Sequence, residues 1–108
     1  MGLLGILQRY DTVERITRFI CHKDIVPSWE EWCVGLAEAP ERALRFDPKA
    51  SFANSFAVPV GSVAVARGVQ KHLIKRYGMD RGLIDGENPR YVYVFKKTAD
   101  IHVQDEAS

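Results

Sequence analysis

The chain has 108 residues, which is enough for one hydrophobic core and too few for two. Its content of 46% hydrophobic and 27% charged residues is typical of a globular domain and excludes an intrinsically disordered chain. With 15 Lys and Arg residues against 14 Asp and Glu residues, the net charge is +1, so attraction to nucleic acid or to an anionic membrane requires a local patch.

The cysteines and the first residues predict a cytoplasmic protein without membrane contact. Cys21 and Cys33 form no CxxC pair and no disulfide framework, so we expect two reduced, packed thiols. The apolar start, Met-Gly-Leu-Leu-Gly-Ile-Leu, lacks the basic leader and the cleavage site of a signal peptide. It is also much shorter than the roughly 20 residues that cross a bilayer.

An apolar stripe near the N-terminus predicts a first helix with one buried face. The stripe consists of Leu3, Ile6, Leu7, Tyr10, Val13, Ile16 and Ile20. Asp11 followed by Glu14 also fits a capping pair, which would place the start of the helix at Thr12 after a separate short turn.

Residues 29–36 carry signals for both a helix and a strand. Ser28 and Glu31 have the spacing of a capping box. Against a helix, Trp32, Cys33 and Val34 are aromatic, small and β-branched, and Gly35 would weaken a helix interior. We expect a strand over about 30–36. A short helix is predicted over Glu41–Phe46, after Pro40 at a position where a helix begins.

The rest of the chain predicts a short strand, a long helix and a closing strand. The short strand covers Asn54–Val58 and ends at Pro59. The long helix covers Ser62–Tyr77, with Ser62 as N-cap and Gly78 at the C′ position. Its buried stripe consists of Ala66, Val69, Leu73 and Tyr77.

Residues 78–89 are rich in glycine and acidic residues and predict a loop, which the closing strand, residues 90–98, follows. Both faces of this strand are apolar, so we expect it inside the sheet, with Tyr91, Tyr93 and Phe95 in the core rather than stacked on nucleobases. The expected fold is α+β, a small three-stranded, mostly antiparallel sheet covered by helices. One domain would span residues 1–108, with its core at about 10–98 and a flexible tail at 99–108.

Two segments together have a familiar order and spacing. In the first segment, residues 32–44, an expected strand is followed by a helix that starts with Glu-Arg-x-Leu; it reads Trp-Cys-Val-Gly-Leu-Ala-Glu-Ala-Pro-Glu-Arg-Ala-Leu. The second segment, residues 66–73, reads Ala-Arg-Gly-Val-Gln-Lys-His-Leu. The first resembles the second half of the GIY-YIG nuclease signature, and the second resembles a later helix of that superfamily. With the closing strand, which is similar to that of small bacterial members, the resemblance covers roughly residues 29–98.

The resemblance implies a nuclease site whose working residues are replaced. In the superfamily a tyrosine activates water, an arginine steadies the scissile phosphate and a glutamate holds a divalent metal. These positions fall on Cys33, Ala43 and Gln70, with Arg42 beside the arginine position. An amide is a poor sole ligand for Mg²⁺. We therefore expect a non-catalytic domain without metal or cofactor; a divalent-metal-dependent nuclease with a rearranged site is an alternative.

A row of basic residues on the long helix suggests a different activity. Arg67, Lys71 and Lys75 recur every four residues, and together with Arg42 they predict weak, nonspecific nucleic-acid binding. The same row also fits an ordinary solvated surface. The competing hypothesis is a protein-interaction domain or homodimer that contacts no nucleic acid and associates through the apolar N-terminal segment.

The remaining candidates have simpler explanations. Lys96 and Lys97 either extend the basic patch or protect a sheet edge. The acidic residues of the 78–89 segment have no cation-loop spacing and fit turn chemistry: Asp80, Asp85 and Glu87. The histidines have no paired ligands at metal spacing: His22, His72 and His102.

Overall fold

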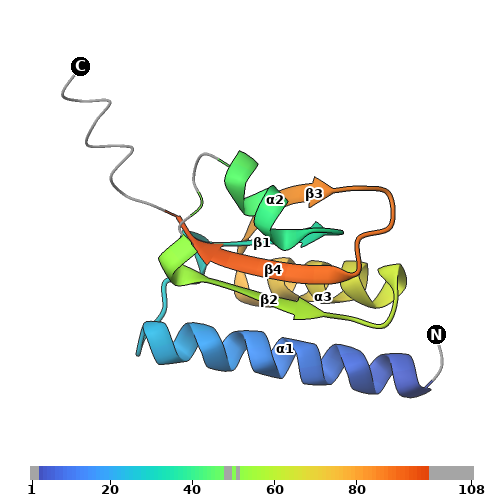
Figure 1. Cartoon of the computed structure of the whole chain (residues 1–108). Coiled ribbons are helices and arrows are strands. Elements are labelled where there is room, and N and C mark those ends of the chain that lie inside the picture. Colours follow the sequence, from blue (N-terminus) through green and yellow to red (C-terminus); the bar gives the residue numbers. More distant parts are fainter. Residues whose placement is uncertain (1–2, 48–49, 51, 98–108) are drawn as a thin grey trace.

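The computed structural model describes residues 3–47, 50 and 52–97, which form one sheet covered by helices (Figure 1). The helices are α1 (Leu3–Lys23), α2 (Pro40–Phe46) and α3 (Val63–Tyr77), with 3-10 turns η1 (Trp29–Glu31) and η2 (Phe52–Asn54). The strands are β1 (Trp32–Ala37), β2 (Ser55–Pro59), β3 (Asp80–Asp85) and β4 (Tyr91–Lys96). The predicted α+β class is confirmed.

The sheet has the strand order β2-β4-β1-β3 and is mixed. Strand β4 runs antiparallel to both of its neighbours, β2 and β1, whereas β1 and β3 run parallel. The expected three-stranded sheet was therefore wrong in number: the described residues form four strands, and one of the three pairings is parallel.

The missing strand, β3, lies in the segment that the sequence predicts as a loop. Its residues, Asp-Arg-Gly-Leu-Ile-Asp, lie at the edge of the sheet, and four of the six are exposed. An edge strand is held by backbone hydrogen bonds on one side and needs no alternating apolar face. Its glycine and aspartates therefore resemble turn residues in the sequence.

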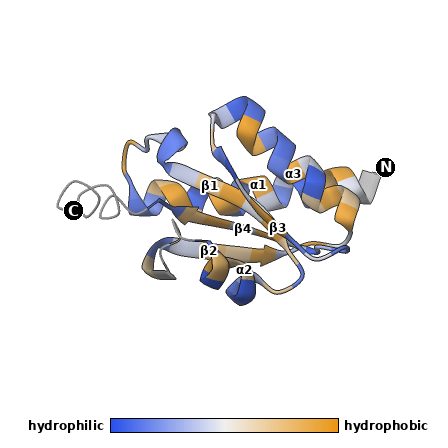
Figure 2. Ribbon diagram, turned by 90° about the horizontal axis from the view of Figure 1, so that it is seen from above, coloured by the Kyte–Doolittle hydropathy of each residue, from blue (hydrophilic) through white to orange (hydrophobic). Residues whose placement is uncertain are grey.

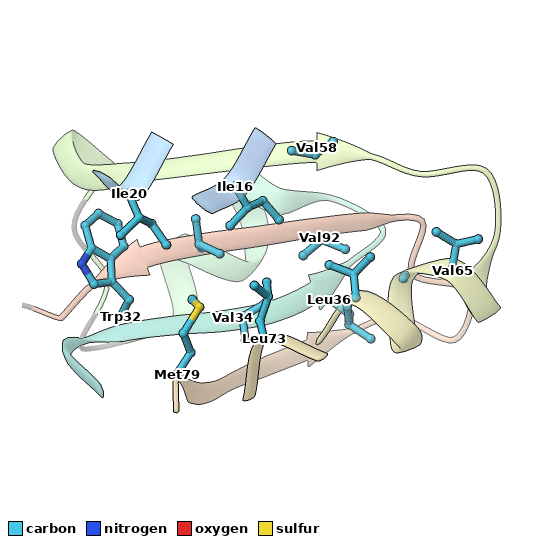
Figure 3. Close-up of a cluster of buried hydrophobic side chains, with 13 residues drawn as sticks. Ile16, Ile20, Trp32, Val34, Leu36, Val58, Val65, Leu73, Met79 and Val92 are labelled. Carbon is cyan, nitrogen blue, oxygen red and sulfur yellow. The ribbon is translucent and has the colours of Figure 1, made fainter. Parts of the chain in front are cut away.

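Helices α1 and α3 cover one face of the sheet, and α2 covers the other (Figure 2). The main core lies under α1 and α3 and is shown in Figure 3. Its most deeply buried side chains include Ile16, Ile20, Trp32, Val34, Leu36, Val69, Leu73, Val92 and Val94. Tyr93 and Phe95 are fully buried towards α2, so the prediction of an interior strand with two apolar faces is confirmed.

Helix α1 is continuous, so the alternative start at Thr12 was wrong. The hydroxyl of Thr12 donates to the carbonyl of Gln8, one turn earlier in the same helix, at 2.8 Å. In the second half of the predicted stripe, Ile16 and Ile20 are fully buried and Val13 packs against the core. In the first half Ile6, Leu7 and Tyr10 remain exposed, because the core cluster begins at Val13.

The ambiguous segment contains both of the structures that its residues favour. A 3-10 turn over Trp29–Glu31 follows Ser28, whose side chain makes no capping bond, and β1 then begins at Trp32. The caps of α3 are as predicted: Ser62 Oγ accepts from Val65 N at 3.2 Å, and Gly78 adopts a φ of 78°.

Two further expectations concern the cysteines and the tail. Cys33 is packed as expected, whereas Cys21 is exposed on α1, because it lies off the buried stripe. Residues 98–108, with the predicted tail, the end of the closing strand and His102, lie outside the described residues.

Candidate nucleic-acid interface

The positions that match the nuclease site are buried on opposite faces of the sheet. Cys33 is 2% exposed and lies in the cluster towards α2, and Ala43 of α2 is on the same side. Gln70 of α3 lies on the other side, where its Nε2 donates to the carbonyl oxygen of Val34 at 3.0 Å. The sheet therefore separates Gln70 from the other two, and the three positions share no open cleft.

Gln70 has a structural role beside an irregularity in the sheet. Between the pairs Val34–Arg81 and Leu36–Ile84, one residue of β1 faces two residues of β3, which is a β-bulge. A bulge disrupts the regular ladder, and the side chain of Gln70 contacts the backbone at this point.

Tyr93 contacts the same β-bulge from the opposite face of the sheet. Its ring lies over Gly35, where a Cβ atom would come within 2.2 Å of the ring, and its hydroxyl donates to the carbonyl of Leu83 at 2.8 Å. Burial raises the pKa of the Tyr93 phenol well above its usual value. The phenol is therefore a neutral hydrogen-bond donor at physiological pH.

Arg42 lies apart from the basic row of α3 and is already paired. Its guanidinium forms a two-pronged contact with the carboxylate of Asp85, with Nε–Oδ1 and Nη2–Oδ2 distances of 3.0 and 2.9 Å. The hydrogen bond from Arg42 lowers the pKa of Asp85. The pair ties α2 to β3 across the sheet edge, on the far side from α3.

The two lysines at the end of β4 are also engaged in ion pairs. Lys96 contacts Asp24 at 3.1 Å, and Lys97 contacts Asp80 at 3.2 Å. These cations therefore join elements of the fold, and they do not extend the basic row.

A groove of about 1010 Å³ lies between α1 and α3 on the outer side of the molecule. Lys71 and Lys75, both predicted as binding residues, line it together with Arg76. The opposite wall comes from α1 and includes Arg9 and Tyr10. The remaining lining residues are Val13, Glu14, Thr17, Gly68, His72 and Tyr77.

The cations of α3 are not neutralised within the described part of the chain. Arg67, Lys71, Lys75 and Arg76 are the charged residues of this helix, which has no Asp or Glu. None of them takes part in the ion pairs among the described residues, which involve Arg18, Arg42, Lys96 and Lys97. The row of α3 therefore presents unneutralised positive charge to solvent.

A glycine brings the two walls of the groove together. Arg9 of α1 packs so closely on Gly68 of α3 that a Cβ atom there would lie 2.7 Å from Nη1 of Arg9. A glycine inside a helix lowers its stability by about 1 kcal/mol relative to alanine. Here it allows the guanidinium of α1 to lie beside the lysines of α3.

No family model matches the chain, and neither the curated proteins nor the solved structures contain a match to it.

Residues 3–47, 50 and 52–97 contain neither a metal-binding cluster of acidic, His or Cys side chains nor a helix that could span a membrane. In these ranges, no group of three or more His, Cys, Asp or Glu side chains is placed to hold a metal ion. No helix within them has both the length and the apolar character needed to cross a bilayer.

The sequence predicted one wall of the groove and missed the other. Arg9 and Tyr10 are about sixty positions from Lys71, and no short-range pattern connects them. The available signal was Gly68: a glycine in the middle of an amphipathic helix indicates a close approach of another element.

Proposed function

We propose that this protein is a non-catalytic, GIY-YIG-like domain that binds nucleic acid weakly and without sequence preference through the groove between α1 and α3. The observation that supports this proposal most directly is the set of unneutralised cations on α3, three of which line the groove: Lys71, Lys75 and Arg76.

The spacing of the cations suits a polyanionic backbone. Successive members of the row Arg67, Lys71 and Lys75 are four residues apart, which corresponds to a rise of about 6 Å along a helix. Arg9 adds a charge from the opposite wall. Contacts of this kind attract phosphates of any sequence, and their strength falls as salt displaces them.

The resemblance to a nuclease contributes a fold prediction and no catalytic residues. Gln70 is 4% exposed and bonded to Val34, and Cys33 is buried on the opposite face. Neither side chain is available to a phosphodiester in the groove. The proposal is therefore binding without cleavage.

Fluorescence anisotropy with a labelled oligonucleotide tests the proposal. We expect binding at about 50 mM salt that weakens steeply towards about 200 mM. The double variant Lys71→Glu/Lys75→Glu should lower the affinity by about tenfold or more, because it reverses two charges that line the groove.

The matched control is Arg45→Glu. Arg45 is exposed on α2, on the other side of the sheet, so this variant changes the net charge without touching the groove. Its affinity should stay within about twofold of wild type. Absence of binding at low salt, or equal losses in both variants after correction for net charge, would contradict the proposed function.

A second candidate function is self-association through the first half of α1. Its support is the exposure of Ile6 and Leu7, at 39% and 56%, on a helix that continues past the core. Sedimentation equilibrium should then show a dimer that Leu7→Glu dissociates. A monomer at all concentrations removes this candidate.

A further inference from the structure

Tyr10 is an aromatic side chain that the fold does not use. Its side chain is 74% exposed, and none of the ring contacts among the described residues involves it. It lines the groove directly after Arg9 in the chain. If a ligand with a flat apolar surface covered this ring, the removal of the ring from water would make the free energy of binding more favourable.

The other tyrosine of the groove is already packed. Tyr77 lies against Trp29 with a centroid distance of 4.7 Å and belongs to the edge of the main core. Tyr77 lines the groove but is half-buried, and His72 lies near its ring as well, at a centroid distance of 6.1 Å. Among the tyrosines of the groove, Tyr10 is therefore the one without a ring neighbour in the described residues.

The form of the groove distinguishes single strands from duplexes. A duplex keeps its bases stacked on one another, so their ring faces are not accessible to an aromatic side chain of the protein. A single strand is narrow and flexible, and its bases can turn out onto aromatic rings while cationic side chains follow the backbone. A concave site with cations on both walls and an open ring on one of them matches the second ligand.

We infer that the ligand of the groove is single-stranded nucleic acid, with a base stacked on Tyr10 and phosphates along Lys71 and Lys75. This inference rests on the proposed function and adds the class of ligand to it. Base stacking on an aromatic ring depends little on sequence, so the preference should be for strandedness and not for particular bases.

The experiment compares a single-stranded oligothymidylate with a hairpin duplex that has the same number of phosphates. The wild-type protein should bind the single strand more tightly. Tyr10→Leu should weaken binding of the single strand roughly 5- to 100-fold and leave duplex binding within about twofold, because stacking is lost while the cations stay. Tyr10→Phe should restore single-strand binding, because the ring face is retained.

Several outcomes would overturn the inference. If the duplex binds as tightly as the single strand, or if Tyr10→Leu has the same effect on both, the ring does not stack on a base. Equal affinity for polyglutamate would likewise show that only negative charge is recognised. In each of these cases, binding that still depends on Lys71 and Lys75 preserves the proposed function. Absence of binding to every probe rejects both the proposed function and the inference about the ligand.

A folding control accompanies the binding experiment. Because Tyr10 is exposed, the thermal unfolding of Tyr10→Leu should match that of wild type, which confirms that the variant is folded.

Discussion

Two side chains from opposite layers bond to carbonyl groups beside the bulge between β1 and β3. Gln70 reaches the carbonyl of Val34 from the α3 side, and Tyr93 reaches that of Leu83 from the α2 side. The structure leaves no buried side-chain nitrogen or oxygen unsatisfied among the described residues. Because a buried polar group without a partner is costly, both residues are expected to contribute to stability.

The first prediction concerns the hydroxyl of Tyr93. Tyr93→Phe keeps the ring over Gly35 but removes the donor to Leu83, so the free energy of unfolding should fall by about 1–2 kcal/mol. Urea denaturation measures the change. Tyr91→Phe is the control, because Tyr91 is only half-buried and makes none of the side-chain hydrogen bonds observed in the described residues; equal losses in both variants would contradict this role.

A second prediction follows from the raised pKa of Tyr93. In the unfolded chain the phenol ionises near its ordinary pKa of 10.0, whereas burial keeps it protonated in the folded protein. The stability that Tyr93 provides is therefore complete below pH 10.0 and is lost as the pH rises further, by up to about 1.4 kcal/mol per pH unit. Urea midpoints measured up to about pH 11 should show the advantage of wild type over Tyr93→Phe shrinking. A constant difference between the two proteins across this range would be inconsistent with burial of the phenol.

At the scale of an element, α3 combines ordinary helix signals with one unfavourable residue. Ser62 caps its start and Gly78 ends it, while Gly68 weakens its middle. The side chain of Arg9, which comes from α1, packs against α3 at Gly68. The helix therefore gives up some stability at the position where the two walls of the groove meet.

The third prediction separates stability from binding in this helix. Gly68→Ala should raise the free energy of unfolding by up to about 1 kcal/mol, because alanine favours the helix and the end of the Arg9 side chain can move. The displaced guanidinium should weaken nucleic-acid binding about as much as Arg9→Ala does. Thermal unfolding and anisotropy measure the two effects. In the double variant Arg9→Ala/Gly68→Ala, the binding losses should not add; additive losses would show that Gly68 acts by another route.

The sequence predicted those elements whose own residues determine their structure. The helix over 62–77 and the closing strand carry strong periodic patterns and were found within one or two residues. Strand β3 was missed because its stability comes from pairing with β1, which is a long-range property. Ile6, Leu7 and Tyr10 were misassigned as buried, because periodicity shows which face of a helix is apolar but not how far the sheet extends beneath it.

The candidate site was predictable to the same extent. Lys71 and Lys75 follow from the spacing on one helix. Arg42 lies apart from them, since α2 is on the opposite face of the sheet and its arginine pairs with Asp85. The partners from α1, Arg9 and Tyr10, required the packing of two helices that are distant in the chain.

At the scale of the whole molecule, the nuclease-like positions are divided between two layers. Cys33 and Ala43 lie towards α2, and Gln70 lies under α3. A substitution that restores the superfamily's residue at one of them therefore cannot bring the three together.

The fourth prediction is that Gln70→Glu creates no nuclease. The new carboxylate would be buried against the carbonyl of Val34 without a donor, so the free energy of unfolding should fall by at least about 2 kcal/mol. Urea denaturation and incubation with Mg²⁺ and plasmid measure the two outcomes. Gln70→Met, which loses the donor without adding a charge, should be less destabilised. Cleavage by Gln70→Glu would show that the nuclease layout is intact after all.

The concentration of cations on α3 also affects how a polyanion approaches the molecule. Helix α3 holds four of the 15 Lys and Arg residues and none of the 14 Asp and Glu residues, so the remainder of the chain is net negative despite the overall charge of +1. We expect the cations of α3 to attract an approaching polyanion before contact, so that collisions with the groove foremost are favoured. Salt should then act mainly on the rate of association, and the lifetime of the complex should change much less.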